Sequence, residues 1–101
     1  MSFSDTLHAH VRLATLRLLE QSPGYAANSS IITTSVNELG LRVSRDFVAT
    51  ELAWLDEQGL IKLDRVPTST KDILVAVLKE RGMDVALGLA TVPGVKRPSP
   101  V

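Results

Sequence analysis

The fold is decided by one stretch, Gly40-Leu-Arg-Val-Ser-Arg-Asp-Phe-Val-Ala-Thr-Glu-Leu-Ala-Trp-Leu-Asp-Glu-Gln-Gly-Leu-Ile61. Ser44 follows a short turn, and its hydroxyl can accept a hydrogen bond from a free amide of a helix that begins beside it. Gly59 can adopt the left-handed conformation that ends a helix. The stretch therefore predicts a tight turn, a helix from about Arg45 to Gln58, a glycine stop and the start of a strand.

This predicted helix has two different faces. An inward row recurs every three or four positions and is expected to seal the core, and its members are Val48, Leu52 and Leu55. The outward row consists of Arg45, Asp46, Ala49, Thr50 and Ala53. We therefore expect the outward row to be free to contact a partner.

Two more helices are predicted before this one. From Asp5 to Gln21, apolar residues recur at the three-to-four spacing of a broadly buried helix. Ser22-Pro23-Gly24 is expected to end it. A shorter second helix is capped by Ser29 or Ser30 and ends before Gly40.

After Gly59 the pattern changes to an alternation of apolar and polar residues, which is typical of a strand. The alternation breaks at Pro67-Thr-Ser-Thr70, and an apolar run from Ile73 to Leu78 follows. These segments predict two strands joined by a polar tip. Because odd-numbered and even-numbered residues of this run are both apolar, both faces of the strand are apolar. We expect one face to meet the helices and the other to meet the last helix or a second copy of the chain. A short final helix is expected over residues 79–88.

The length of 101 residues suits one domain, which we place at residues 1–91. Residues 92–101 contain three prolines and two cations, and we expect them to form a flexible basic tail with nothing to bury. The formal net charge is zero, but residues 1–59 carry four cations against seven anions and residues 60–101 carry seven cations against four anions. Any anion-binding surface is therefore expected to draw on the second part of the chain.

Cysteine is absent, which excludes disulfides and thiolate metal sites and fits a reducing compartment. The first residues lack the features of a secretory signal, and no apolar run approaches the ~20 residues needed to span a bilayer. We expect a soluble protein in the cytoplasm of a bacterial host, without a membrane partner.

The order helix, helix, helix, strand, strand, helix resembles bacterial winged-helix regulators of the ArsR and MarR type. The residues that carry the resemblance are Val43-Ser-Arg-Asp46 and Leu52-Ala-Trp-Leu-Asp-Glu-Gln-Gly-Leu-Ile61. The chain resembles still more closely the small winged-helix proteins of Mu-like bacteriophages and prophages, over roughly residues 5–90. The resemblance implies a winged helix-turn-helix, mainly α with a two-stranded β wing, and a role in DNA binding and transcription regulation. It departs from ArsR metal sensors, whose ligands are cysteines.

In the DNA-binding interpretation, the helix after Ser44 enters the major groove and the wing holds the flanking backbone. The candidate contacts are Arg42, Ser44, Arg45, Ala49, Thr50, Lys62, Arg65 and Lys71. Arg45 is expected to reach base edges, Arg42 a phosphate, and Thr50 a thymine methyl. The charge of residues 42–58 opposes this interpretation, because two arginines face four acidic residues there.

The alternative interpretation is a protein–protein interaction module that binds a phage or host protein. Its surface would be the strip of Ala49, Thr50 and Ala53, and the acidic end at Asp56-Glu57 would select a partner of complementary charge.

No catalytic motif and no cofactor site are predicted from the sequence. No metal site is predicted either, since His8 and His10 fall on nearly opposite sides of a helix. A homodimer is expected from the two-sided apolar run of residues 73–78, from the double apolar row of the first helix and from the weak charge of a single copy.

Overall fold

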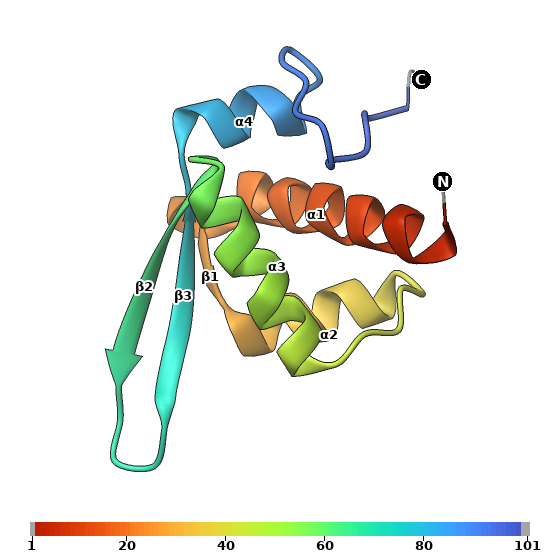
Figure 1. Cartoon of the computed structure of the whole chain (residues 1–101). Coiled ribbons are helices and arrows are strands. Elements are labelled where there is room, and N and C mark those ends of the chain that lie inside the picture. The colour runs from red at the N-terminus through yellow and green to blue at the C-terminus, as the bar shows by residue number, and fades with distance from the viewer. Residues whose placement is uncertain (1, 100–101) are drawn as a thin grey trace.

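The computed structural model describes residues 2–99 and has an α+β fold in which helices predominate. The elements, in chain order, are α1 (Phe3–Gln21), the short 3-10 turn η1 (Pro23–Tyr25), β1 (Ala26–Asn28), α2 (Ser29–Glu38), α3 (Arg45–Glu57), β2 (Ile61–Pro67), β3 (Asp72–Leu78) and α4 (Glu80–Ala86). Helix α1 runs through the middle of the molecule and packs against α2, α3 and α4 (Figure 1). The β2–β3 hairpin projects away from this helical body (Figure 1).

The strands form one three-stranded antiparallel sheet in the order β1-β3-β2. The prediction of a two-stranded sheet is therefore wrong in its strand count. The additional strand, β1, is three residues long and pairs Ala27 with Ala76 of β3. Its sequence, Ala-Ala-Asn, has neither the β-branched residues nor the alternation that marks a strand, so only its pairing with β3 defines it.

The predicted start and stop of α3 are confirmed. The amide of Phe47 donates to the Ser44 hydroxyl at 3.0 Å, which caps the first turn. Gly59 has a φ of +75°, and the amide of Leu60 reaches back to the carbonyl of Leu55 at 3.0 Å. These two contacts fix the direction in which the chain enters β2.

The other two early helices begin slightly outside the predicted positions, because their caps are different residues. Helix α1 starts at Phe3, since Ser2 and Asp5 form a reciprocal capping box in which the Asp5 amide lies 3.1 Å from the Ser2 hydroxyl oxygen. Helix α2 is capped by Asn28, whose side chain accepts from the amide of Ile31 at 2.8 Å. A serine was expected in that role, and asparagine serves equally well.

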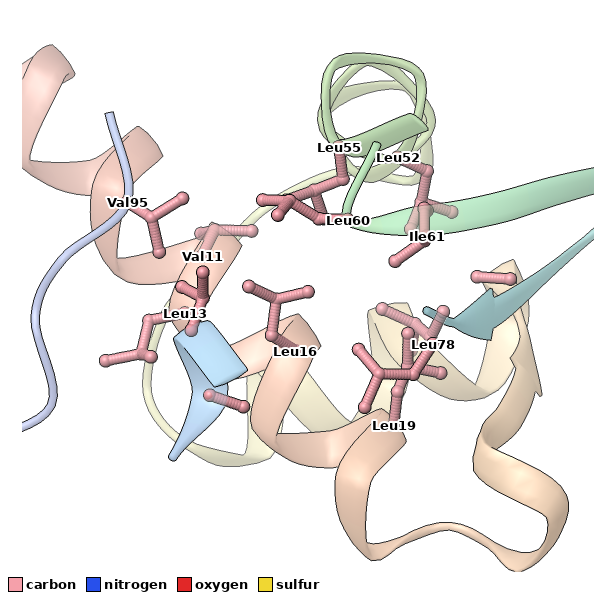
Figure 2. Close-up of a cluster of buried hydrophobic side chains, with 14 of the residues drawn as sticks. Val11, Leu13, Leu16, Leu19, Leu52, Leu55, Leu60, Ile61, Leu78 and Val95 are labelled. Atoms are coloured by element: carbon pink, nitrogen blue, oxygen red, sulfur yellow. The ribbon is translucent and has the colours of Figure 1, made fainter. Parts of the chain in front are cut away.

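The core lies where α1, α3 and the base of the hairpin meet (Figure 2). The predicted inward row of α3 is confirmed, because Val48, Leu52 and Leu55 are completely buried. They meet Leu16 and Leu19 of α1, which are buried to the same extent. Burial of this kind contributes about 1.5–3 kcal/mol for each large side chain.

Gly82 explains why α4 can pack so closely on the turn that leads into β2. A Cβ atom at this position would lie 2.1 Å from the carbonyl oxygen of Leu60. The same carbonyl accepts a hydrogen bond from the amide of Lys79 at 3.1 Å. A glycine that is unfavourable for a helix is thus required by a close approach of two backbones.

The segment after α4 packs against α1, and the expectation that nothing after residue 91 is buried is wrong. Val92 and Val95 are 3% and 7% exposed. The amide of Lys96 donates to the carbonyl of Ala9 at 3.2 Å. Prolines prevent a helix here, and residues 92–99 form a C-terminal strap that turns where the amide of Val95 donates to the carbonyl of Val92 at 3.1 Å, so that both valines reach the core. Residues 100 and 101 of the expected tail lie outside the described residues.

Within residues 2–99 no helix combines the length and the apolar character that crossing a membrane requires.

Candidate nucleic-acid interface

The N-terminal end of α3 carries two exposed arginines. Arg42 lies in the turn before the helix, and Arg45 lies in its first turn. The guanidinium of Arg45 donates to the hydroxyl of Ser30 in the first turn of α2. This contact joins the two helices at one end of the molecule and places a cation there.

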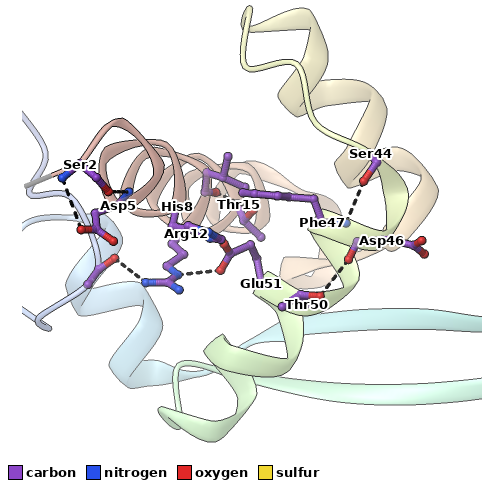
Figure 3. A network of polar contacts seen from close by, with 12 residues as sticks. Ser2, Asp5, His8, Arg12, Thr15, Ser44, Asp46, Phe47, Thr50 and Glu51 are labelled. Carbon is purple, nitrogen blue, oxygen red and sulfur yellow. Dashed lines mark hydrogen bonds and ion pairs between the residues drawn. The ribbon is translucent and has the colours of Figure 1, made fainter.

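The β2–β3 hairpin reaches the same end of the molecule. Strand β2 begins near the C-terminal end of α3 and contacts the helix. The 13 residues of α3 span roughly 20 Å, and the seven residues of β2 span roughly 23 Å. The hairpin extends in the direction of the N-terminal end of α3 in both views (Figures 1 and 3). The tip therefore points toward the end of the molecule at which α3 begins, although the hairpin diverges sideways from the helix (Figure 1).

The tip has a defined shape. The hydroxyl of Thr68 accepts from the amide of Lys71 at 3.1 Å, and the amide of Thr68 donates to the carbonyl of Lys71 at 3.1 Å. The side chain of Lys71 is exposed. A cation therefore stands on an ordered turn at the same end as Arg45.

The other two hairpin cations take part in exposed ion pairs. Arg65 lies 3.7 Å from Asp72 on the neighbouring strand, and Lys62 lies 3.8 Å from Asp64. Exposed pairs of this kind contribute about 0–1 kcal/mol, so a phosphate can compete for either cation. Lys62 stands at the start of β2, near the C-terminal end of α3, and the fold does not bring it together with Arg42 and Arg45.

The outward face of α3 is less uniform than expected. Thr50 and Ala53 are exposed, whereas Ala49 is half-buried. The hydroxyl of Thr50 donates to the carbonyl of Asp46 at 3.0 Å. Ser44 is exposed, but its hydroxyl is occupied by the cap of α3. Thr50 thus presents its methyl group outward more readily than its hydroxyl.

Glu51 is the feature that the sequence interpretation missed. Its side chain is only 1% exposed, although it was counted among the surface charges of α3. The Nε atom of Arg12 lies 2.7 Å from the Oε2 atom of Glu51, and the imidazole Nδ1 of His8 contacts the other carboxylate oxygen (Figure 3). The helical spacing indicates this burial, because position 51 lies three residues after Val48 and four before Leu55, on the same buried face.

The burial of Glu51 changes the electrostatics of α3. With this carboxylate paired to Arg12, the exposed charges of residues 42–58 are Arg42 and Arg45 against Asp46, Asp56 and Glu57, a balance of −1 instead of −2. Asp56 and Glu57 stand in the last turn, at the opposite end from the hairpin tip. Residues 42–50, which include the turn before α3, therefore carry Arg42 and Arg45 against Asp46, a local balance of +1.

Arg12 also ties α3 to the C-terminal strap. Its guanidinium carbon lies 3.8 Å from the centre of the Trp54 ring, and its Nη1 atom donates to the carbonyl of Gly94 at 3.0 Å. On the other side of Glu51, the ring of His8 stacks on Phe47 with centroids 4.7 Å apart. The two aromatic residues of α3 are therefore used inside the fold and are not platforms for stacking bases.

Comparison with known proteins gives one match over nearly the full length. The chain is 39% identical to protein gp26 of Escherichia phage Mu over 97 residues, which cover 96% of this chain and 96% of the phage protein. The chain belongs to the family of phage Mu gp26. A protein of Haemophilus influenzae strain Rd is 44% identical over 66 residues, and this match spans 65% of the chain and 64% of the Haemophilus protein. Both relatives are described as uncharacterized proteins.

The match to Mu gp26 supports the resemblance to Mu-like phage proteins. It covers all but a few residues of the chain, so α3, the hairpin and the C-terminal strap fall within it. No protein-family model and no solved structure matches the chain significantly. The resemblance to ArsR and MarR regulators is therefore not supported by these comparisons, and the description of Mu gp26 assigns no activity.

Proposed function

We propose that this chain is a double-stranded DNA-binding protein of the winged-helix type, acting as a phage or prophage regulator in the cytoplasm of a bacterial host. Helix α3 is the recognition helix, and the β2–β3 hairpin is the wing. The observation that supports this most strongly is the direction of the hairpin, whose tip, with Lys71, extends toward the end of the molecule at which α3 begins with Arg45 (Figure 1).

The two parts of this surface have different roles. Arg45 stands in the first turn of α3, from which side chains of a recognition helix reach base edges. Arg42, Arg65 and Lys71 are placed to contact phosphates on either side. With about three phosphate contacts, binding by one copy is weak and falls with salt, because each contact releases condensed counterions.

The burial of Glu51 strengthens this proposal. A helix in the major groove faces a dense line of phosphates, so a free carboxylate in the middle of α3 would be repelled. Arg12 neutralises that carboxylate from the inside of the fold. The remaining acidic residues of α3 beyond Asp46 lie in its last turn, away from the tip of the wing.

The test is fluorescence anisotropy of a labelled DNA duplex at low salt with the full chain. Arg45→Ala is expected to weaken binding about tenfold, as the loss of a bidentate base contact does. Lys79→Ala is the matched control, since it removes one exposed cation at the start of α4, away from the wing tip. Equal effects of the two variants would contradict the proposed site.

The interaction module remains the second candidate, on the strength of one observation. Ala53, Asp56 and Glu57 form an exposed, acidic continuation of the outward face of α3. Such a surface suits a basic partner protein better than DNA. If the chain shows no affinity for DNA at low salt and Asp56→Lys abolishes retention of a phage protein, this candidate replaces the first.

A further inference from the structure

Helix α1 lines a groove on the side that faces α2, and the core residues Leu13 and Val36 contribute to its lining. The groove runs between α1 and α2 and has a volume of about 520 Å³. The α1 wall consists of residues three or four positions apart, namely His10, Leu13, Ala14, Arg17 and Leu18. The opposite wall is the end of α2 and the turn after it, with Val36, Leu39 and Leu41. Most of the groove surface is therefore apolar.

A leucine stands exposed beside this groove. Leu39, which ends α2, has an exposed fraction of 69%. Its backbone is held in place, because its amide lies 3.2 Å from the carbonyl of Ser35 and 3.1 Å from the carbonyl of Val36. A fixed apolar projection next to an apolar hollow is what an isologous interface requires, since each copy supplies both parts.

The groove carries charges of both signs, with Arg17 and Lys96 against Glu38. Arg17 is an exposed cation on the α1 wall, and Glu38 is an exposed anion on the α2 wall. Neither forms an ion pair within the part of the chain that the structure describes. A two-fold axis along the groove places the α1 wall of one copy over the α2 wall of the other. Arg17 of each copy then faces Glu38 of its partner, and each Leu39 enters the partner's groove.

We propose that this groove is the contact surface between two copies of the chain in a symmetric dimer. The occupant is a second copy because one patch supplies the projecting Leu39, the apolar groove that can receive it, and charges of both signs. A different partner would not require the projection and the groove to lie on the same patch. This dimer interface does not depend on DNA binding. It lies on α1 and α2, and not on β3, whose apolar residues 73–78 also suggested a dimer contact.

The test is sedimentation equilibrium of the full chain, without DNA, up to about 100 µM. The wild-type chain is expected to dimerise. Leu39→Glu is expected to weaken the dimer at least about tenfold, because it brings a carboxylate into each apolar hollow. Val66→Glu is the matched control, as Val66 is 45% exposed on the hairpin and lies opposite Ile73 of β3. Circular dichroism of each variant verifies that the fold is retained.

A charge exchange provides the sharper result. Arg17→Glu and Glu38→Arg are each expected to weaken the dimer, since like charges then meet twice across the interface. The two substitutions together are expected to restore it. A monomeric wild-type chain, a dimer that resists Leu39→Glu but not Val66→Glu, or a double variant weaker than both single variants would each overturn the proposal. None of these outcomes depends on whether the chain binds DNA.

Discussion

Arg12 of α1 holds the buried carboxylate of Glu51 of α3 with its Nε atom at 2.7 Å, across 39 positions of sequence. The guanidinium of Arg12 continues to the ring of Trp54 and the carbonyl of Gly94. One side chain thus connects α1, the proposed recognition helix and the C-terminal strap. The orientation of α3 relative to the rest of the domain depends on this connection.

Removing Glu51 is expected to destabilise the fold strongly. Glu51→Ala leaves Arg12 without its partner in a largely buried place, and breaking such a pair costs about 3–5 kcal/mol. Glu57→Ala, an exposed position on the same helix, is expected to change the free energy of unfolding by less than about 0.5 kcal/mol. Urea denaturation monitored by circular dichroism measures both. Similar losses for the two variants would show that the buried pair has no special role.

The pair is also expected to be replaceable. When both partners become apolar, as in Arg12→Met with Glu51→Leu, no uncompensated charge remains inside the domain. This double variant is therefore expected to be more stable than either Arg12→Ala or Glu51→Ala, in the same urea titration. A double variant less stable than both would point to a need for the charges themselves.

Gly94 is expected to be much less tolerant of substitution than Gly40. Both have a positive φ, of +98° and +87°, so alanine strains the backbone at either position. A Cβ atom at Gly94 would also lie 2.9 Å from the Trp54 ring, whereas nothing lies within 4 Å of one at Gly40. Gly94→Ala is expected to cost about 1–3 kcal/mol more than Gly40→Ala. Equal melting temperatures would show that the strap does not press on Trp54.

Deleting residues 92–101 is expected to lower the melting temperature clearly. The deletion removes Val92 and Val95 from the core and the hydrogen bond between Arg12 and Gly94. The loss for two buried valines is about 3–5 kcal/mol. Removing only residues 98–101 retains both valines and serves as the control. An unchanged melting temperature after the longer deletion would support the free tail that the sequence suggested.

Gly82→Ala is expected to disrupt the packing of α4. The new methyl group would overlap the carbonyl of Leu60, and backbone on both sides limits relaxation. We expect a loss of about 2–4 kcal/mol, although alanine is the better helix former. Differential scanning calorimetry measures it. A stabilised variant would contradict the close approach of α4 to the turn before β2.

Local signals predicted much of this fold. Ser44 and Gly59 mark the two ends of α3 through chemistry that is complete within a few residues, and the structure confirms both. The inward row of α3 follows from helical periodicity alone. Strand β1 is not predicted from the sequence, because its three small or polar residues form a strand only by pairing with β3.

The remaining differences depend on contacts between distant segments. Helical spacing places Glu51 on the inward face of α3, but its partner Arg12 lies 39 positions away and cannot be identified from the segment around Glu51 alone. Val92 and Val95 flank Pro93 and Gly94, a composition that normally indicates a loose end. The segment is held by contacts with distant residues, namely Ala9 and Arg12 of α1 and Trp54 of α3, which no local pattern predicts.

The most direct test of DNA binding is the salt dependence of affinity. The association constant of the full chain for a DNA duplex is measured at several salt concentrations, and its logarithm is plotted against that of the salt concentration. About three phosphate contacts predict a slope of roughly −2.7 for one bound copy, and Lys71→Ala is expected to reduce its magnitude by about 0.9. Absence of binding at low salt, or a slope that Lys71→Ala leaves unchanged, would contradict the proposed interface of α3 and the hairpin.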